Sequence, residues 1–321
     1  MKEIKINTIE NIKIGHAQDK EGGTGCTVII CENGAPTGVD VRGGGPASRE
    51  TELLNPTAAA EKVHAVLLSG GSAFGLDAAG GVMRYLSERN IGFDTGIAKI
   101  PLVCESCIFD LVVGRSDAYP DGKMAYAACV DAQRNDPEEG NVGAGTGATV
   151  GKIRGPQTMM KSGLGVYAVQ IGALKVGAVV SVNALGDIFD AENGQKLAGL
   201  LTTDLMNFDD SEAVMYEGME PKEIGYASNT TIGVIITNGC FNKVQAKKIA
   251  AMAQNGLAKS ICPVHTTMDG DSVYAMSVGS IKADIDSVGT LAARVMAQAV
   301  KRAVMLTENA YGLKTATDFL K

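Results

Sequence analysis

Few residues in this sequence could act as a nucleophile through a neighbouring histidine. Only His16, His64 and His265 occur, none in an H-E-x-x-H pattern, and the sequence has no G-x-S-x-G motif. A threonine at the start of a chain needs no histidine, because its own α-amine, with a pKa near ~8, can accept the hydroxyl proton. The step from Asn229 to Thr230 fits this chemistry, since a small turn-forming residue precedes an apolar strand. An ordinary strand start fits the same pattern.

Asp269 and Asp271 form a second group that could do chemistry. Side chains two residues apart on an extended segment lie on the same face. Two such carboxylates could share a proton and orient a hydroxyl group. The intervening Asp-Gly step is equally typical of a solvated turn. The pair alone therefore leaves catalysis and a surface turn both open.

Two glycine-rich segments could surround a ligand with backbone N–H groups. Gly70, Gly71 and Ser72 lie between an apolar strand and a helix, where anions bind, and Gly143 and Gly145 form the second segment. Neither segment has the lysine of a Walker loop or the G-x-G-x-x-G spacing after a strand. We therefore expect no nucleotide. The segments favour tight turns, or N–H groups that line a substrate pocket or stabilise an oxyanion.

The seven cysteines predict reduced, mostly buried thiols. Their number is odd, and Cys104 and Cys107 form a C-x-x-C without the second pair that a zinc site needs. We expect neither a metal nor a cofactor.

Composition limits the class of partner. Of 321 residues, 45% are hydrophobic, which can build a large core, and the net charge of -7 makes nucleic acid an unexpected partner. We find no basic and apolar leader and no run of about 18 apolar residues. We therefore expect a cytoplasmic protein with no membrane partner.

Hydrophobic spacing predicts the elements that must position these residues. Buried strands are expected over 65–68, 166–171, 175–183 and 230–237. Helices are expected to begin at Asn55-Pro56, after Gly71 and at Asn242, with a last one over 288–306. The polar stretch 199–226 predicts a loop. This mixed order favours a single α+β domain over residues 1–321.

Several segments together carry a resemblance that no single one carries. They are Arg42-Gly43-Gly44-Gly45-Pro46 with Arg49-Glu50-Thr51, the stretches 66–79, 108–111, 140–148 and 182–187, and Asn229-Thr230-Thr231-Ile232-Gly233-Val234. In this order they resemble the P1 peptidase family of DmpA-type aminopeptidases, β-peptidyl aminopeptidases and nylon-oligomer hydrolases, over nearly the whole chain.

The resemblance implies a fold, an assembly and a maturation step. The fold would be an αββα sandwich of the DmpA and ornithine acetyltransferase type, assembled as a homo-oligomer, often a tetramer. Self-cleavage would give residues 1–229 and 230–321.

The resemblance also assigns residues. Thr230 would be the catalytic nucleophile, Asn229 the residue before the cut, and Asn183 the active-site asparagine. Asp269 and Asp271 would be the acidic pair, and Lys152 a lysine near the site. An aspartate at both acidic positions is similar to the threonine-type nylon-hydrolase branch, because the aminopeptidase branch has a serine at the first. The family also uses a tyrosine, for which Tyr119 and Tyr126 are both nearby and neither is chosen.

The implied activity is hydrolysis of small peptides or related amides through an acyl-enzyme. Two alternatives remain open: an acyltransferase of the ornithine acetyltransferase type, and a binding homologue without catalysis. The sequence does not name the substrate.

Overall fold

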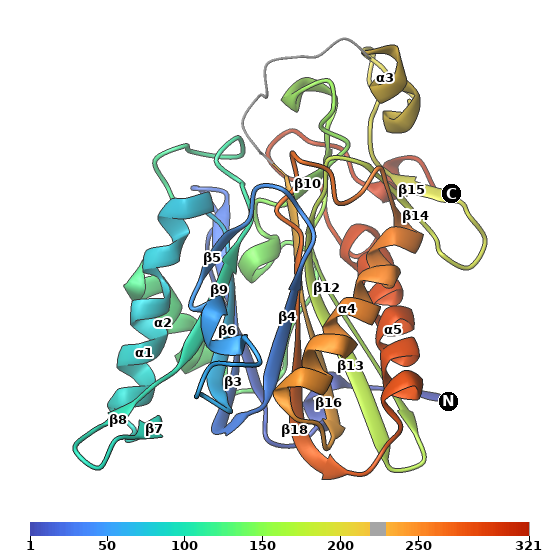
Figure 1. Cartoon of the computed structure of the whole chain (residues 1–321). Helices are drawn as coiled ribbons and strands as arrows, with labels where there is room; N and C mark the ends of the chain where they lie inside the picture. The colour runs from blue at the N-terminus through green and yellow to red at the C-terminus, as the bar shows by residue number, and fades with distance from the viewer. Residues whose placement is uncertain (219–228, 321) are drawn as a thin grey trace.

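Two β-sheets lie face to face between two layers of helices in the computed structural model, which describes residues 1–218 and 229–320 (Figure 1). The six-stranded sheet has the order β1-β12-β13-β16-β18-β4. Its strands are β1 (Lys2–Ile4), β4 (Thr37–Val41), β12 (Leu164–Ile171), β13 (Leu174–Asn183), β16 (Thr230–Gly239) and β18 (Ser272–Ile281). β16 is antiparallel to β13 and parallel to β18.

The second sheet has five strands in the order β2-β3-β6-β9-β5. They are β2 (Lys13–Asp19), β3 (Thr24–Ala35), β5 (Ala47–Arg49), β6 (Val63–Ser69) and β9 (Val103–Cys107). β6 is buried along its whole length and runs parallel to β9. Short strands form the remaining pairings: β7 (Phe93–Asp94) with β8 (Lys99–Ile100), β10 (Thr149–Val150) with β11 (Met160–Lys161), and β14 (Asp187–Phe189) with both β15 (Lys196–Ala198) and β17 (Ile261–Cys262).

Helices cover the outer face of each sheet. α1 (Ala79–Ser87) and α2 (Gly122–Asp131) pack on the five-stranded sheet, whereas α4 (Lys243–Ser260) and α5 (Ile285–Met305) pack on the six-stranded sheet. The short α3 (Ser211–Glu217) lies beyond the sheets. Each layer boundary has its own apolar core, and the core between the sheets joins residues of both, including Val66 and Leu68 with Ile232 and Val234. The fold class is therefore α+β, with an αββα sandwich.

Alternation along β16 explains how one strand serves two cores. Ile232, Val234 and Ile236 face the other sheet, while Ile235 belongs to the core beneath α4 and α5. Gly233 leaves room for Met296 of α5, because a Cβ there would lie 2.9 Å from the methionine methyl group. Both faces of the strand are therefore packed, and its first residue, Thr230, is buried.

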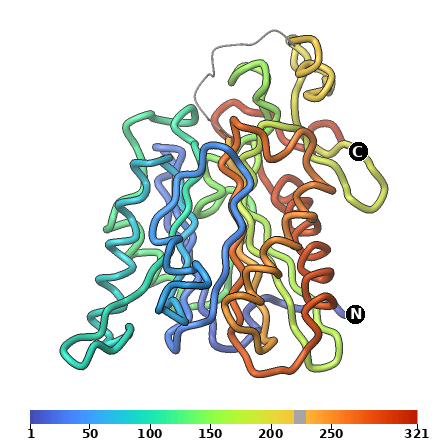
Figure 2. The backbone as a smooth tube through the Cα atoms, viewed as in Figure 1, coloured from blue at the N-terminus to red at the C-terminus, as the bar shows by residue number. Residues whose placement is uncertain are grey.

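Segments that are distant in sequence meet in the six-stranded sheet. β4 pairs with β18, and Figure 2 shows this early segment running beside the C-terminal part of the chain. β13 pairs with β16 from Asn183 opposite Thr230 to Val176 opposite Thr237. The C-terminal strands β16 and β18 therefore lie between strands that come from before residue 229.

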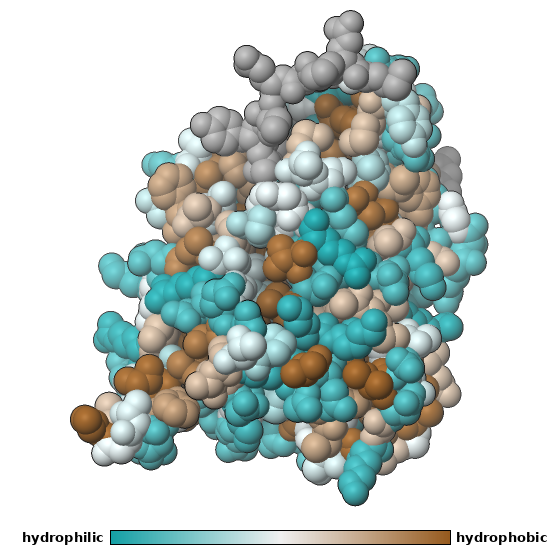
Figure 3. Space-filling view, viewed as in Figure 1, coloured by the Kyte–Doolittle hydropathy of each residue, from teal (hydrophilic) through white to brown (hydrophobic). Residues whose placement is uncertain are grey.

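An apolar hairpin projects from the surface. The β7–β8 hairpin extends from the sandwich, and Figure 3 shows apolar side chains at its tip. Ile97 is 97% exposed, and Phe93 and Ile100 are also exposed. No helix within the described ranges has the length and apolar character needed to span a membrane.

Most of the predicted strands and helices are present. The strands at 166–171, 175–183 and 230–237 are found as β12, β13 and β16, and Asn242 caps α4 through a capping box with Gln245. The predicted last helix is α5.

Two predictions differ from the structure. No helix begins at Asn55: its side chain accepts hydrogen bonds from the Thr57 N–H and hydroxyl groups, which closes a local turn instead. Within the predicted loop 199–226, α3 forms behind Asp210, whose side chain accepts the N–H of Ala213. Residues 219–226 of that prediction lie outside the described residues.

Candidate active site

Thr230 opens β16 with its hydroxyl group against the peptide bond that precedes it. The side chain is buried, and its Oγ1 donates to the carbonyl oxygen of Asn229. The same carbonyl accepts the N–H of Gly270 at 2.9 Å. An N–H group aimed at a carbonyl oxygen polarises that carbonyl and stabilises the negative charge that develops when it is attacked. The geometry therefore suits attack by Thr230 on its own chain.

Asn183 lies opposite Thr230 in the sheet ladder, which places two predicted site residues together. The Oδ1 atom of Asn183 accepts from Lys152 Nζ at 2.8 Å and from the N–H of Thr149 at 3.1 Å. Its Nδ2 group donates to the carbonyl of Phe109 at 3.0 Å. Asn183 is thus fixed at both ends of its amide group, and Lys152 is positioned beside it.

Asp269 and Asp271 approach the start of β16 from the loop before β18. Asp269 lies in a bridge with Asn229, and its carboxylate accepts from the Thr266 hydroxyl at 2.5 Å and from the Leu185 N–H at 3.3 Å. Asp271 Oδ1 accepts the N–H of Thr231 at 2.7 Å. Both carboxylates are buried, and the backbone of Asp269 lies beside Asn229 while the side chain of Asp271 is bonded directly after Thr230.

The charges at this site are set by burial and by one another. Burial lowers the pKa of Lys152 to about 7, although the carboxylates of Asp269, Asp110 and Asp271 oppose this. Burial first, and then the charge of Asp271, raise the pKa of Asp269 to about 6. A lysine and a carboxylic acid that both exchange protons near neutral pH are suited to acid–base work.

The first glycine-rich segment is bound to the protein through its own N–H groups. Gly71 N–H donates to Asp110 Oδ1 at 2.7 Å, Gly70 N–H to the Gly25 carbonyl, and Ser72 N–H to the Ile108 carbonyl. Gly71 has φ of 80°, which favours glycine. These N–H groups have internal acceptors, so their predicted contact with substrate remains a prediction.

The second glycine-rich segment is held in the same way. Gly143 N–H donates to Gln18 and Gly145 N–H to the Val142 carbonyl. Lys161, fully buried, donates to the carbonyls of Gly145 and Ala148. The turn then delivers Thr149 to Asn183, so the segment contributes to the site at least through that contact.

Three site neighbours were not assigned from the sequence. Gly270, between the two aspartates, allows no side chain, because a Cβ would lie 2.8 Å from Thr230 Oγ1. Asp110, buried with its pKa raised to about 6 by burial, belongs to a segment of the resemblance but received no role. The Nδ1 atom of His265 lies 2.8 Å from Asp271. Of these three, Gly270 alone could have been noticed in the sequence, because it lies between two predicted acidic site residues.

The two tyrosines left open by the sequence have different surroundings. Tyr119 stacks on Phe74 with ring centroids 5.1 Å apart, and its Cβ lies close to Gly71. Tyr126 donates to Glu88 on the outside of the molecule. Tyr119 is therefore the one beside a predicted site segment.

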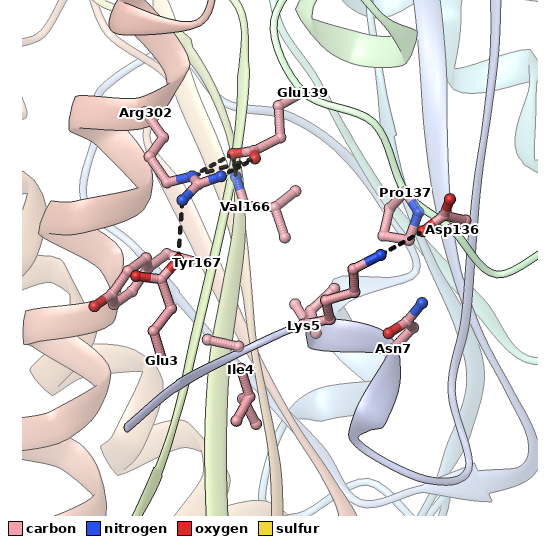
Figure 4. Close-up of a pocket in the computed structure, with 12 residues that line it drawn as sticks. Glu3, Ile4, Lys5, Asn7, Asp136, Pro137, Glu139, Val166, Tyr167 and Arg302 are labelled. Carbon is pink, nitrogen blue, oxygen red and sulfur yellow. Dashed lines mark hydrogen bonds and ion pairs between the residues drawn. The ribbon is translucent and has the colours of Figure 1, made fainter. Parts of the chain in front are cut away.

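A separate hollow of about 470 Å³ lies beside β1 and contains none of the predicted site residues. Its charged groups pair with one another: Arg302 binds Glu139 and Glu3, and Lys5 lies 3.7 Å from Asp136 (Figure 4). Since these charges are mutually neutralised, the hollow offers little to a charged ligand.

The fold is that of the Ntn-hydrolase class. The solved L-aminopeptidase D-Ala-esterase/amidase of Ochrobactrum anthropi, described as a variant of that fold, superposes with a TM-score of 0.73, covering 97% of this chain and 90% of that chain at 16% identity. A beta-aminopeptidase from Burkholderia sp. gives a TM-score of 0.66 at 16% identity, covering 97% and 89%.

Sequence comparison defines the family. The chain belongs to peptidase family S58, whose model matches residues 5–317. It is 35% identical to an uncharacterized aminopeptidase of Mycobacterium leprae (strain TN), over 97% of this chain and 92% of the relative. It is 30% identical to a 6-aminohexanoate-oligomer endohydrolase of Kocuria sp. (strain KY2), over 91% and 83%. The chain is therefore a hydrolase of peptide or related amide bonds, and the resemblance found in the sequence is confirmed.

Proposed function

We propose that the chain cuts itself between Asn229 and Thr230 and then hydrolyses amides with Thr230 as an N-terminal nucleophile. The observation that carries this proposal is the buried Thr230 hydroxyl against the Asn229 carbonyl, which also accepts the Gly270 N–H. The cut would leave residues 1–229 and 230–321.

Maturation begins when Thr230 Oγ1 attacks the Asn229 carbonyl carbon. The bond from that carbon to the Thr230 nitrogen breaks, the nitrogen takes the hydroxyl proton, and an ester joins Asn229 to Oγ1. Gly270 N–H stabilises the oxyanion during this step. Water then hydrolyses the ester, which leaves a carboxylate on Asn229 and a free amine on Thr230.

Turnover reuses the same atoms. The freed amine accepts the Oγ1 proton, and the oxygen attacks the substrate carbonyl to form an acyl-enzyme. The proton passes to the leaving amine, and water then releases the acyl group. Lys152 and Asn183 stabilise negative charge on the carbonyl oxygen, Asp271 holds the Thr231 N–H directly after the nucleophile, and Asp269 exchanges protons.

The substrate class follows from the relatives. The relatives are named as aminopeptidases and 6-aminohexanoate-oligomer endohydrolases, and an aspartate at both acidic positions favours the second group. We propose small peptides or aminohexanoate oligomers as substrates. Release of product from these amides without an added acceptor would separate hydrolysis from the alternative acyl transfer to an amine.

Thr230→Ala tests the proposal. We expect an uncut chain by intact mass and no amide hydrolysis, whereas Thr230→Ser keeps a hydroxyl and retains both reactions at reduced rates. A Thr230→Ala protein that is still cut or still active would show that another residue is the nucleophile.

A further inference from the structure

His265 is bonded to one member of the acidic pair. Its Nδ1 atom lies 2.8 Å from Asp271 Oδ2, and its backbone N–H donates to the same oxygen at 3.2 Å. An ionised carboxylate can only accept hydrogen bonds, so Nδ1 carries the proton in this contact. His265 Nε2 is buried and has no hydrogen-bond partner in the part of the chain that is described, so the Nδ1 bond orients the ring.

The other oxygen of Asp271 reaches the nucleophile's own strand. Asp271 Oδ1 accepts the N–H of Thr231 at 2.7 Å, and Thr231 is fully buried directly after Thr230. A continuous path of hydrogen bonds therefore runs from the imidazole through the carboxylate to the backbone that carries the Thr230 hydroxyl.

We propose that His265 is a positioning residue for Thr230, acting through Asp271. The Nδ1–H group fixes the carboxylate, and the carboxylate fixes the Thr231 N–H, so that Thr230 Oγ1 stays against the carbonyl it attacks. This inference rests on the proposed function of Thr230. It gives a role to a histidine that does not itself reach the reacting atoms.

The two aspartates differ in a way that fits this role. Asp271 accepts three N–H groups, two of them from His265. Asp269 accepts the hydroxyl and N–H of Thr266 and the N–H of Leu185, and burial first, then the charge of Asp271, raise its pKa to about 6. His265 therefore fixes the orientation of the Asp271 carboxylate, whereas Asp269, with its raised pKa, is the member of the pair suited to exchange a proton.

The backbone at His265 defines a matched pair of variants. His265 has φ of 58°, in the left-handed region that asparagine and aspartate tolerate best among residues with a side chain. In His265→Asn, the Nδ2 group replaces Nδ1 as the donor to Asp271. His265→Asp has nearly the same shape but, at pH 8, no donor and a like charge.

The test follows self-cutting by intact mass at pH 8 and amide hydrolysis of the mature enzymes. We expect His265→Asn to cut within about threefold of the wild-type rate and His265→Asp about 10²-fold more slowly, which is the cost of a misplaced reactant. In hydrolysis, kcat should fall and KM should stay unchanged, because the contact positions the nucleophile and does not bind substrate. Equal rates for the two folded variants, or a change confined to KM, would overturn the proposal.

A second measurement applies if His265→Asp does not fold. Asp271→Asn removes the ionised acceptor and should slow cutting. His265→Gly suits the left-handed backbone at this position and removes the imidazole donor, so it should slow cutting on its own. Added to Asp271→Asn it should cost little more, because the coupling is already lost. Additive losses would overturn the inference. Thr230→Ala is run in parallel: if that variant is cut, the proposed function fails, whereas an inert Thr230→Ala beside a fast His265→Asp removes only the role of His265.

Discussion

At the scale of single residues, two buried lysines differ in what their ammonium groups contact. Lys152 bonds the side chain and carbonyl of Asn183 beside the acidic pair, whereas Lys243 bonds the carbonyls of Ala58 and Ala60. We expect Lys152→Met to slow cutting and hydrolysis by about 10²-fold, as for a lost oxyanion donor. Lys243→Met should lower the unfolding free energy and leave the cutting rate of folded protein near wild type. Similar kinetic losses in both variants would refute a chemical role for Lys152.

Glu105 provides a test of pH dependence. It is fully buried on β9, and burial raises its pKa from 4.5 to about 8. Between these values the unfolded chain releases a proton that the folded protein keeps, so wild-type stability falls as the pH rises. Glu105→Gln removes this loss. The unfolding free energy of the variant minus that of the wild type should therefore grow by roughly 1.4 kcal/mol per pH unit from pH 5 to pH 8. Urea unfolding at the two values measures it, and a constant difference would contradict the shift.

Single residues were predictable where a sequence segment carries the chemistry. Thr230 and Asn183 lie in segments of the resemblance, the two aspartates were first named from their spacing, and the resemblance assigned Lys152 individually. The structure brings these residues to one place, while their roles stay proposals. His265 received no role from the sequence, because its contact with Asp271 becomes visible only in the fold. Asp110 likewise gains its meaning only from contacts with Gly71 and Thr24 across the fold.

At the scale of elements, the contact between α4 and α5 depends on one small residue. A Cβ on Gly256 of α4 would lie 2.3 Å from the Ala293 carbonyl of α5, whereas one on Gly80 of α1 would meet nothing within 4 Å. We expect Gly256→Ala to destabilise by about 1–3 kcal/mol through overpacking. Gly80→Ala should stabilise by up to about 1 kcal/mol through helix propensity. Thermal unfolding of both variants measures these changes in stability. An increase in stability for both variants would mean that α4 and α5 can move apart at little cost.

Elements were predicted where local spacing decides them. The strands at 166–171 and 175–183 and the capped helix after Asn242 follow from periodicity and a turn or cap within the same segment. The helix expected after Asn55 failed because the asparagine side chain competes for nearby N–H groups. The order of strands in the sheet could not be predicted from local hydrophobic spacing, because β4 and β18 pair across more than half of the chain.

At the scale of the whole molecule, the exposed hairpin tip predicts an assembly. Ile97, Phe93 and Ile100 place apolar surface in water, which is typical of a contact with another protein surface. We propose that copies of this chain form a homo-oligomer through this hairpin. Light scattering should give a multiple of the chain mass, and Ile97→Asp should reduce it. Val130→Asp, at an exposed site on α2, is the control; a monomeric wild type would contradict the proposal.

The placement of β16 and β18 has a consequence for how the mature protein could refold. Both strands come after the proposed cut and are flanked by β13 and β4 from before it. In an uncut chain, the central sheet can form within one molecule. Once cut, two separate chains must meet before the central sheet can form, and refolding becomes bimolecular and dependent on dilution. Before maturation the folded state would be maintained by its equilibrium free energy of unfolding. After maturation it would be maintained by a slow unfolding rate.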